Sequence, residues 1–175
     1  MAATPEEVYH ILSQPVDYPR WWPSVYLAVR ELTHNRIRLH TKGWLLYTLT
    51  WEAITIEKRP PNLLAIRAVG DFEGRGIWSI VPDGEFTDIT FDWKLAVDKP
   101  LLRYLSFALR PAFEANHRWA MEQGLRSLEL ELARGRARTV EEMNSIAPPP
   151  APHMLPMGQL AAGAALSIAL VASLA

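Results

Sequence analysis

The sequence contains no cysteine among its 175 residues. This absence excludes disulfide bonds, thiolate metal sites and cysteine nucleophiles, and it leaves the redox compartment open. The formal net charge at pH 7 is only −1, so the chain lacks the basic surplus of a general nucleic-acid-binding protein. Because of this near-zero net charge, we expect no nucleic-acid partner.

The N-terminus lacks the basic and apolar regions of a secretory signal peptide.

The common catalytic and metal-binding motifs are also missing. The five histidines are scattered, and no two have the spacing of metal ligands on a helix. The sequence has no Gly-x-Ser-x-Gly motif of a serine hydrolase. The glycine-rich segment 70–76 matches neither a phosphate loop nor a dinucleotide-binding pattern. We therefore predict no metal site and no cofactor.

Tryptophan, in contrast, is abundant. The chain has seven tryptophans, and six of them lie between Trp21 and Trp93. Large aromatic side chains fill protein cores, and they also line cavities for flat or apolar ligands. With 49% apolar and 21% charged residues, the chain has the composition of one ordinary globular domain.

The stretch from Leu101 to Arg134 predicts a long helix. Apolar residues recur at steps of three and four, which places one apolar stripe along the helix. In the second half of the stretch this stripe contains Phe113, His117, Met121, Gly124, Leu128 and Leu132. Pro111 removes a backbone donor and clashes with the preceding turn, so we expect a kink or short break near residues 107–111.

Two short helices are expected near the N-terminus. Thr4-Pro5-Glu6-Glu7 has the features of a capping box, with proline at the first helical position. Residues 17–23 predict a second short helix or a turn, because prolines bound it.

Short apolar or alternating stretches then predict an antiparallel sheet. They cover residues 25–32, 36–41, 44–57, 63–69, 77–81 and 88–97. Turns of hairpin length and a glycine-rich bend at 70–76 connect them. Such a sheet needs a cover for its apolar face, and the long helix supplies one. The order of elements predicts an α+β helix-grip fold, with a curved sheet of about six strands around a long C-terminal helix.

Four segments resemble those of a known superfamily. They are residues 19–23 (PRWWP), 42–47 (KGWLLY), 70–78 (GDFEGRGIW) and 110–121 (RPAFEANHRWAM). Together they resemble the START-like (SRPBCC) superfamily, and more narrowly its polyketide cyclase/dehydrase and lipid-transport branch, over about residues 4–140. The resemblance implies a deep apolar cavity between sheet and helix that takes a hydrophobic small molecule. Such folds open with a strand that is missing here, which predicts an exposed sheet edge.

The candidate site residues follow from the helix stripe and the strands. His117 lies on the stripe between Phe113 and Met121, where it either acts as an acid or base or makes a structural hydrogen bond. Asp71, in the glycine-rich bend, either pairs with His117 or is a solvated turn residue. The aromatic residues expected to line the cavity, or only to fill the core, are Trp44, Tyr47, Trp51, Trp78 and Trp93. Tyr47 is a candidate polar anchor because a buried hydroxyl needs a partner.

The chain after residue 140 predicts two further parts. Residues 141–156 contain Pro148-Pro149-Pro150-Ala151-Pro152 and predict a semi-rigid linker. Residues 157–175 contain no charge, and at 19 residues they are just long enough for a transmembrane helix. Arginines at positions 134, 136 and 138 favour a cytoplasmic domain under the positive-inside rule, anchored to the cytoplasmic membrane. A loose apolar tail is the alternative.

Three hypotheses for function remain open. The first is a carrier or binding protein for a hydrophobic molecule such as a lipid, isoprenoid or polyketide. The second is an enzyme of the cyclase or dehydratase type, in which His117 moves a proton with help from Asp71 or Tyr47. The third is an interaction module whose cavity is filled by side chains.

Overall fold

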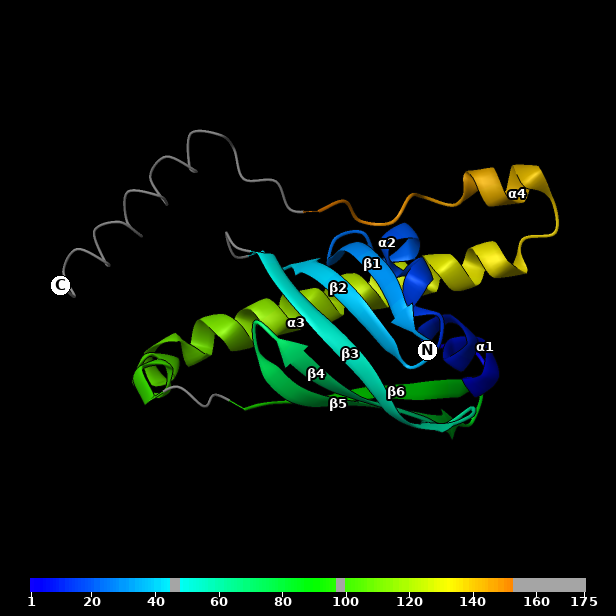
Figure 1. Cartoon of the computed structure of the whole chain (residues 1–175). Helices are drawn as coiled ribbons and strands as arrows, with labels where there is room; N and C mark the ends of the chain where they lie inside the picture. The colour runs from blue at the N-terminus through cyan, green and yellow to red at the C-terminus, as the bar shows by residue number, and fades with distance from the viewer. Residues whose placement is uncertain (45–47, 97–99, 153–175) are drawn as a thin grey trace, which may run out of the picture.

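The structure is a computed structural model that describes residues 1–44, 48–96 and 100–152. Its first half contains helix α1 (Pro5–Leu12), the 3₁₀ turn η1 (Pro15–Asp17), helix α2 (Tyr18–Trp21) and strands β1 (Tyr26–Thr33), β2 (Arg36–Lys42) and β3 (Thr48–Arg59). Its second half contains β4 (Leu63–Gly70), β5 (Glu73–Asp83), β6 (Phe86–Ala96) and helices α3 (Pro100–Arg136) and α4 (Val140–Ser145). Figure 1 shows the strands curving past one side of α3, which confirms the predicted α+β helix-grip arrangement.

The six strands form one antiparallel sheet in the order in which they occur in the sequence. Each strand pairs with the next, as hairpin-length connections require. The strand predicted for residues 44–57 is present as β3 from Thr48, whereas Trp44 is outside a strand and positions 45–47 lie outside the described residues. The predicted glycine-rich bend is also shorter than expected, because β5 already begins at Glu73.

Gly70 explains why the chain turns where β4 ends. Its φ angle is +134°, a conformation that side chains rarely allow. A Cβ atom there would lie 2.9 Å from the Cα of Trp51 on the neighbouring strand. The turn therefore needs glycine for both its backbone angle and its close approach to β3.

The capping box predicted for α1 is confirmed. The Thr4 hydroxyl accepts a hydrogen bond from the Glu7 backbone N–H at 3.2 Å, and the Glu7 carboxylate accepts one from the Thr4 N–H at 2.8 Å. Glu7 also binds Arg136 through two hydrogen bonds of 2.7 and 2.8 Å. The start of the first helix is thereby joined to the end of the last long helix.

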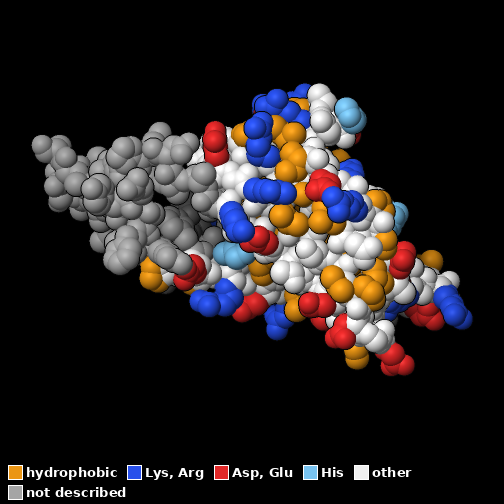
Figure 2. Space-filling model, turned by 90° about the horizontal axis from the view of Figure 1, so that it is seen from below, with side chains coloured by type: hydrophobic (Ala, Val, Ile, Leu, Met, Phe, Trp, Pro, Cys, Tyr) orange, Lys and Arg blue, Asp and Glu red, His pale blue; other side chains and the backbone are white. Residues whose placement is uncertain are grey.

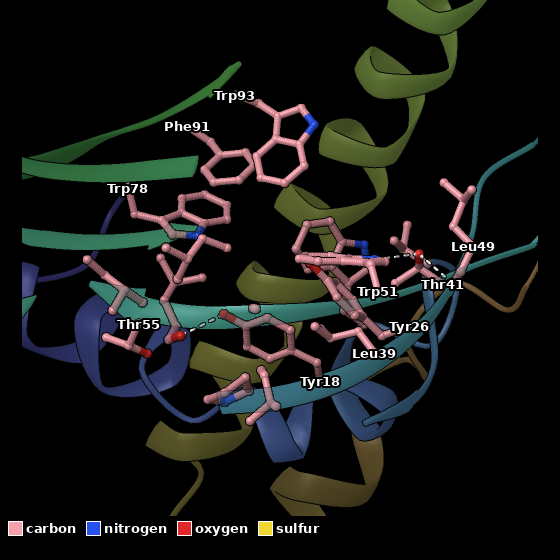
Figure 3. Close-up of a pocket in the computed structure, with 18 of the residues that line it drawn as sticks. Tyr18, Tyr26, Leu39, Thr41, Leu49, Trp51, Thr55, Trp78, Phe91 and Trp93 are labelled. Carbon is pink, nitrogen blue, oxygen red and sulfur yellow. Dashed lines mark hydrogen bonds between the residues drawn. The ribbon is translucent and has the colours of Figure 1, made fainter. Parts of the chain in front are cut away.

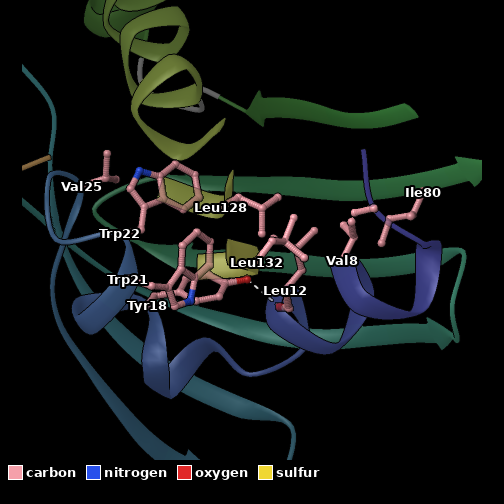
Figure 4. Close-up of a cluster of buried hydrophobic side chains, with 10 residues drawn as sticks. Val8, Leu12, Tyr18, Trp21, Trp22, Val25, Ile80, Leu128 and Leu132 are labelled. Atoms are coloured by element: carbon pink, nitrogen blue, oxygen red, sulfur yellow. Dashed lines mark hydrogen bonds between the residues drawn. The ribbon is translucent and has the colours of Figure 1, made fainter. Parts of the chain in front are cut away.

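Of the predicted kink or short break near residues 107–111, the break is absent, because α3 is helical without interruption across Pro111. Its first turns lie at an angle to the rest of the helix (Figure 1). Farther along, Leu128 and Leu132 pack with Val8, Leu12 and other buried side chains of the main core (Figure 4). This core fixes the second half of α3 against the two N-terminal helices.

The N-terminal residues bind the outer side of β6. The Met1 ammonium group donates to the Thr87 carbonyl at 2.9 Å, and the Thr87 N–H donates to the Met1 carbonyl at 2.8 Å. The Thr87 hydroxyl donates to the Ala3 carbonyl at 2.6 Å. Beyond this short contact, the part of the chain that the structure describes adds no strand outside β6, so the predicted sheet of about six strands is confirmed.

The surface mixes charges of both signs. Arg36 and Arg38 on β2 form ion pairs with Glu52 on β3, with nitrogen–oxygen distances of 2.5 and 2.8 Å. On the face shown in Figure 2, Lys and Arg side chains lie among acidic and hydrophobic ones.

No helix within residues 1–44, 48–96 and 100–152 is long and apolar enough to cross a membrane. The apolar helix predicted for residues 157–175 lies outside the described residues. Helix α4 occupies the first residues of the segment 141–156 that the sequence predicts as a linker, ahead of its run of prolines.

Candidate functional site

A cavity of about 1070 Å³ lies between the inner face of the sheet and α3. Several strands contribute to its wall, which includes Leu39, Trp51, Ile66, Trp78 and Phe91 (Figure 3). The volume slightly exceeds the usual range for small-molecule sites, roughly 300–1000 Å³. The sheet and the helix therefore enclose a space that side chains do not fill.

Strand periodicity directs the aromatic residues into this cavity. On β6, Phe91 and Trp93 are partly buried and line the cavity, whereas Asp92 and Lys94 are exposed. The Phe91 ring stacks on Trp78 at 4.2 Å between ring centroids and on Trp93 at 5.4 Å. The ring centroids of Trp51 and Trp93 are 5.8 Å apart, so one aromatic wall extends from β3 to β5 and β6.

Aromatic residues also enter the cavity wall from the N-terminal segment. Tyr18, Trp22 and Tyr26 line the cavity and contact one another, with the Tyr18 and Tyr26 rings 4.8 Å apart. The Trp22 ring packs against Gly124 of α3, where an added Cβ would lie 2.3 Å from a ring carbon. This close approach brings α2 and α3 together beside the cavity.

His117 lines the cavity from α3, as the helix stripe predicted. The ring is partly buried and lies 6.3 Å from the Phe91 ring centroid. Burial lowers the pKa of His117 below its ordinary value of 6.5, because it disfavours the charged form. No hydrogen bond joins the ring to another described residue, including the carboxylate of Asp71. The imidazole is therefore neutral near pH 7 and faces the cavity.

Asp71 lies at the end of the cavity and is exposed. Its carboxylate accepts a hydrogen bond from the Thr50 backbone N–H at 2.7 Å, and its own N–H donates to the Thr50 carbonyl at 3.2 Å. These bonds hold the bend after Gly70 against β3. The structure does not bring Asp71 into hydrogen-bond contact with His117.

The predicted ligand-binding residues divide into three groups: those that line the cavity, one that does not, and two whose side chains lie outside the described residues. Those that line the cavity are Trp51, Trp78, Trp93, His117 and Met121. Trp44 is not among the lining residues, because it precedes β3; its side chain is 39% exposed, and its backbone N–H donates to the Asn116 side chain at 3.0 Å. Tyr47 and the side chain of Phe113 lie outside the described residues.

Sequence reasoning missed the polar groups inside the cavity. The Tyr18 hydroxyl donates to the Leu12 carbonyl at 2.6 Å, and the Trp51 indole N–H donates to the Thr41 hydroxyl at 3.1 Å. Tyr26 also lines the cavity, and burial raises the pKa of its hydroxyl. The inward direction of Thr41 was predictable from its alternation with Ile37 and Leu39. The direction of the two tyrosine side chains was not, because they flank a tryptophan pair in a segment without periodicity.

Charged residues lie at the two ends of the cavity. One end of the cavity lies where β2 and β4 end and β5 begins. Its charged lining residues are Lys42, Asp71 and Glu73. At the opposite end of the cavity the charged lining residues are Asp17, Glu31 and Lys58. Within the described residues, no group of His, Asp or Glu side chains could hold a metal ion. The interior of the cavity is thus apolar, with a few neutral hydrogen-bonding groups.

Comparison with protein families gives one match. The family described as "Polyketide cyclase / dehydrase and lipid transport" matches residues 1–133, which extend from the N-terminus almost to the end of α3. No curated protein matches the sequence.

Solved structures share the fold at low sequence identity. The crystal structure of TTHA0849 from Thermus thermophilus has a TM-score of 0.63 and 19% identity, covering 78% of this chain and 94% of that one. A protein from Rhodobacter sphaeroides has a TM-score of 0.53 and 21% identity, covering 76% and 86%. CV1439 from Chromobacterium violaceum has a TM-score of 0.53 and 14% identity, covering 73% and 88%. At these identities the likeness supports the fold alone.

Proposed function

The chain belongs to the polyketide cyclase/dehydrase and lipid transport family, and from this premise we propose that it binds a hydrophobic small molecule between its sheet and α3. The cavity itself carries the proposal. Its volume of about 1070 Å³ and its wall of Trp51, Trp78, Phe91 and Trp93 suit a large apolar ligand. Removal of apolar ligand surface from water supplies the free energy of binding, at roughly 25 cal/mol per Å².

Binding is tested first without assuming a ligand. The full chain is purified without detergent, and native mass spectrometry followed by solvent extraction looks for a bound hydrophobic molecule. We expect a co-purifying molecule that identifies the chemical class of the ligand. The same preparation is then titrated with Nile red, an uncharged dye that fluoresces in apolar sites.

A cavity-filling variant connects any binding to this site. Thr55 is on the inner face of β3 and lines the cavity (Figure 3), so Thr55→Phe should lower the affinity for Nile red about tenfold or more. Thr90→Phe is the matched control, because Thr90 is on β6 and does not line the cavity. Equal loss of affinity in both variants, or in neither, would argue against binding in the cavity.

His117 favours a second candidate, an enzyme of the cyclase or dehydratase type. A neutral imidazole facing an apolar cavity is able to accept a proton from a bound polyketone. His117→Ala separates this candidate from a carrier. In an enzyme the variant loses turnover and still binds product, whereas in a carrier it keeps most of its affinity. Asp71 is a weaker partner for the reaction, because Thr50 already engages its carboxylate.

A third candidate, an interaction module with a filled cavity, has less support, since the cavity is open. Failure of every apolar probe to bind would favour it.

The domain boundaries and the membrane anchor are proposals from sequence. We propose a ligand-binding domain over residues 1–140, a linker over 141–156 and an anchor over 157–175, which would hold the domain at the cytoplasmic face of the membrane. Alkaline extraction of membranes from cells that express the full chain tests the anchor. Release of the whole protein into the extract would exclude it.

A further inference from the structure

The polar groups of the cavity differ in whether they already have a partner. Tyr18 donates to the Leu12 carbonyl, and the Trp51 indole donates to Thr41. The Thr41 hydroxyl in turn donates to the Leu49 carbonyl at 3.4 Å. The Tyr26 hydroxyl makes no hydrogen bond with any described residue, although it lines the same cavity and its ring touches Tyr18.

The Tyr26 hydroxyl is not among the described buried polar atoms that lack a partner, so water reaches it. A ligand that displaces this water without offering an acceptor would leave a buried donor unpaired, which costs about 1–3 kcal/mol. The Tyr26 ring extends from the start of β1 into the cavity, near the Trp51 ring (Figure 3). It is therefore placed to donate to an oxygen of a molecule that lies along the aromatic wall.

The charges around the cavity restrict what that oxygen can belong to. Among the described lining residues there is no arginine, and the two lysines are at opposite ends of the cavity. Four carboxylates line the same ends, those of Asp17, Glu31, Asp71 and Glu73. His117 does not supply a cation, because burial lowers its pKa. A carboxylate drawn into the interior would thus lose its hydration without gaining a positive partner, which is strongly unfavourable.

We propose that the cavity selects uncharged ligands that carry an accepting oxygen, such as a long-chain ketone, and that the Tyr26 hydroxyl donates the hydrogen bond to this oxygen. This inference rests on the proposed binding function. It narrows the substrate class to neutral molecules and assigns the anchoring role to a residue of β1.

Three probes of equal chain length test the selection: 2-decanone, decanoate and decane. Each displaces Nile red from the full chain at about pH 8, where decanoate is ionised. We expect 2-decanone to bind at least about tenfold more tightly than decanoate. Equal or tighter binding of decanoate would overturn the inference and leave the proposed function standing. If Nile red and all three probes fail to bind, the proposed function fails and the inference with it.

Tyr26→Phe tests the hydrogen bond. It should lower the affinity for 2-decanone about three- to tenfold and leave that for decane unchanged. Tyr18→Phe is the matched control, because the Tyr18 hydroxyl is already bonded to Leu12 and its loss should not change the ratio of the two affinities. If the ratio of the 2-decanone affinity to the decane affinity is unchanged in Tyr26→Phe, the Tyr26 hydroxyl does not donate to the ligand oxygen. The comparison of ketone with carboxylate uses the unmodified chain, so it stands even where a variant folds poorly.

Discussion

His117 illustrates how one residue combines a core position with a titratable group. Its place on the helix stripe is that of an apolar side chain, yet its ring has no hydrogen-bond partner among the described residues. Burial therefore acts on its protonation without a compensating carboxylate, and the folded chain favours the neutral ring.

This protonation makes stability depend on pH. The pKa of His117 is lower in the folded than in the unfolded chain, so the unfolded chain binds more protons between the two values. The free energy of unfolding should therefore fall as the pH drops below about 6.5 toward the folded pKa. Chemical denaturation at about pH 8 and about pH 5.5 measures this difference.

His117→Gln should show a smaller loss of stability between the two pH values. His40→Gln, at an exposed position on β2, is the control and should lose as much unfolding free energy between the two pH values as the unmodified chain. An equal loss in all three proteins would contradict the prediction.

Glu7 is a second residue whose protonation matters, and its partner is Arg136. The hydrogen bond from Arg136 and the bond from the Thr4 backbone lower the pKa of Glu7 from 4.5 to about 2. Because the folded pKa is lowered, this contribution is present above about pH 4.5 and is lost as the pH falls toward 2.

A double-mutant cycle with Glu7→Gln and Arg136→Ala measures the pair. The pair is largely exposed, so we expect a coupling energy of at most about 1 kcal/mol at pH 7, reduced by salt. The coupling should disappear near pH 2. A coupling that is insensitive to both salt and pH would show that packing, rather than the ion pair, joins the two helices.

At the scale of elements, α3 depends on one glycine for its contact with α2. An added Cβ at Gly124 would lie 2.3 Å from a carbon of the Trp22 ring. That ring is confined by Tyr18, Trp21 and Tyr26, so it has little freedom to move away. The close approach of the two helices therefore fixes one side of the cavity.

Gly124→Ala should destabilise the protein by about 1–3 kcal/mol, because overpacking outweighs the better helix propensity of alanine. Gly135→Ala in the same helix is the control. No atom lies within 4 Å of its added Cβ, so we expect it to be neutral or to stabilise the protein by up to about 1 kcal/mol. Thermal unfolding of both variants gives the comparison, and a more stable Gly124→Ala would contradict the packing argument.

At the scale of the whole molecule, the open cavity links ligand binding to stability. The interior contacts that a filled core would make are missing where the cavity lies. A ligand that binds only the folded chain supplies them and stabilises it by mass action.

Saturation with an apolar ligand should therefore raise the free energy of unfolding. At a free concentration of 100 times the Kd the expected gain is about 2.7 kcal/mol. Denaturation with and without Nile red measures it, and Thr55→Phe should show little gain. A gain of equal size in Thr55→Phe would indicate binding elsewhere on the molecule.

The sequence by itself determined the order and type of the elements. Local signals suffice for these: the capping box at Thr4, the alternation from Asp88 to Lys94 and the stripe through His117. Periodicity also assigned Trp51 and Trp93 to one face of their strands, because side-chain direction in a strand follows from position alone. At Pro111, where the sequence predicts a kink or a short break, α3 changes direction near its start but stays helical.

Only the tertiary structure decided which of these residues meet. The cavity arises because a curved sheet and a helix leave space between them, a property of their spacing that no local pattern contains. Tyr18 and Tyr26 enter the wall through the path of the chain around the tryptophan pair, and Asp71 is bonded to Thr50, a residue 21 positions away. Hydrogen bonds and close contacts between distant segments depend on how elements pack, so they are absent from the sequence pattern.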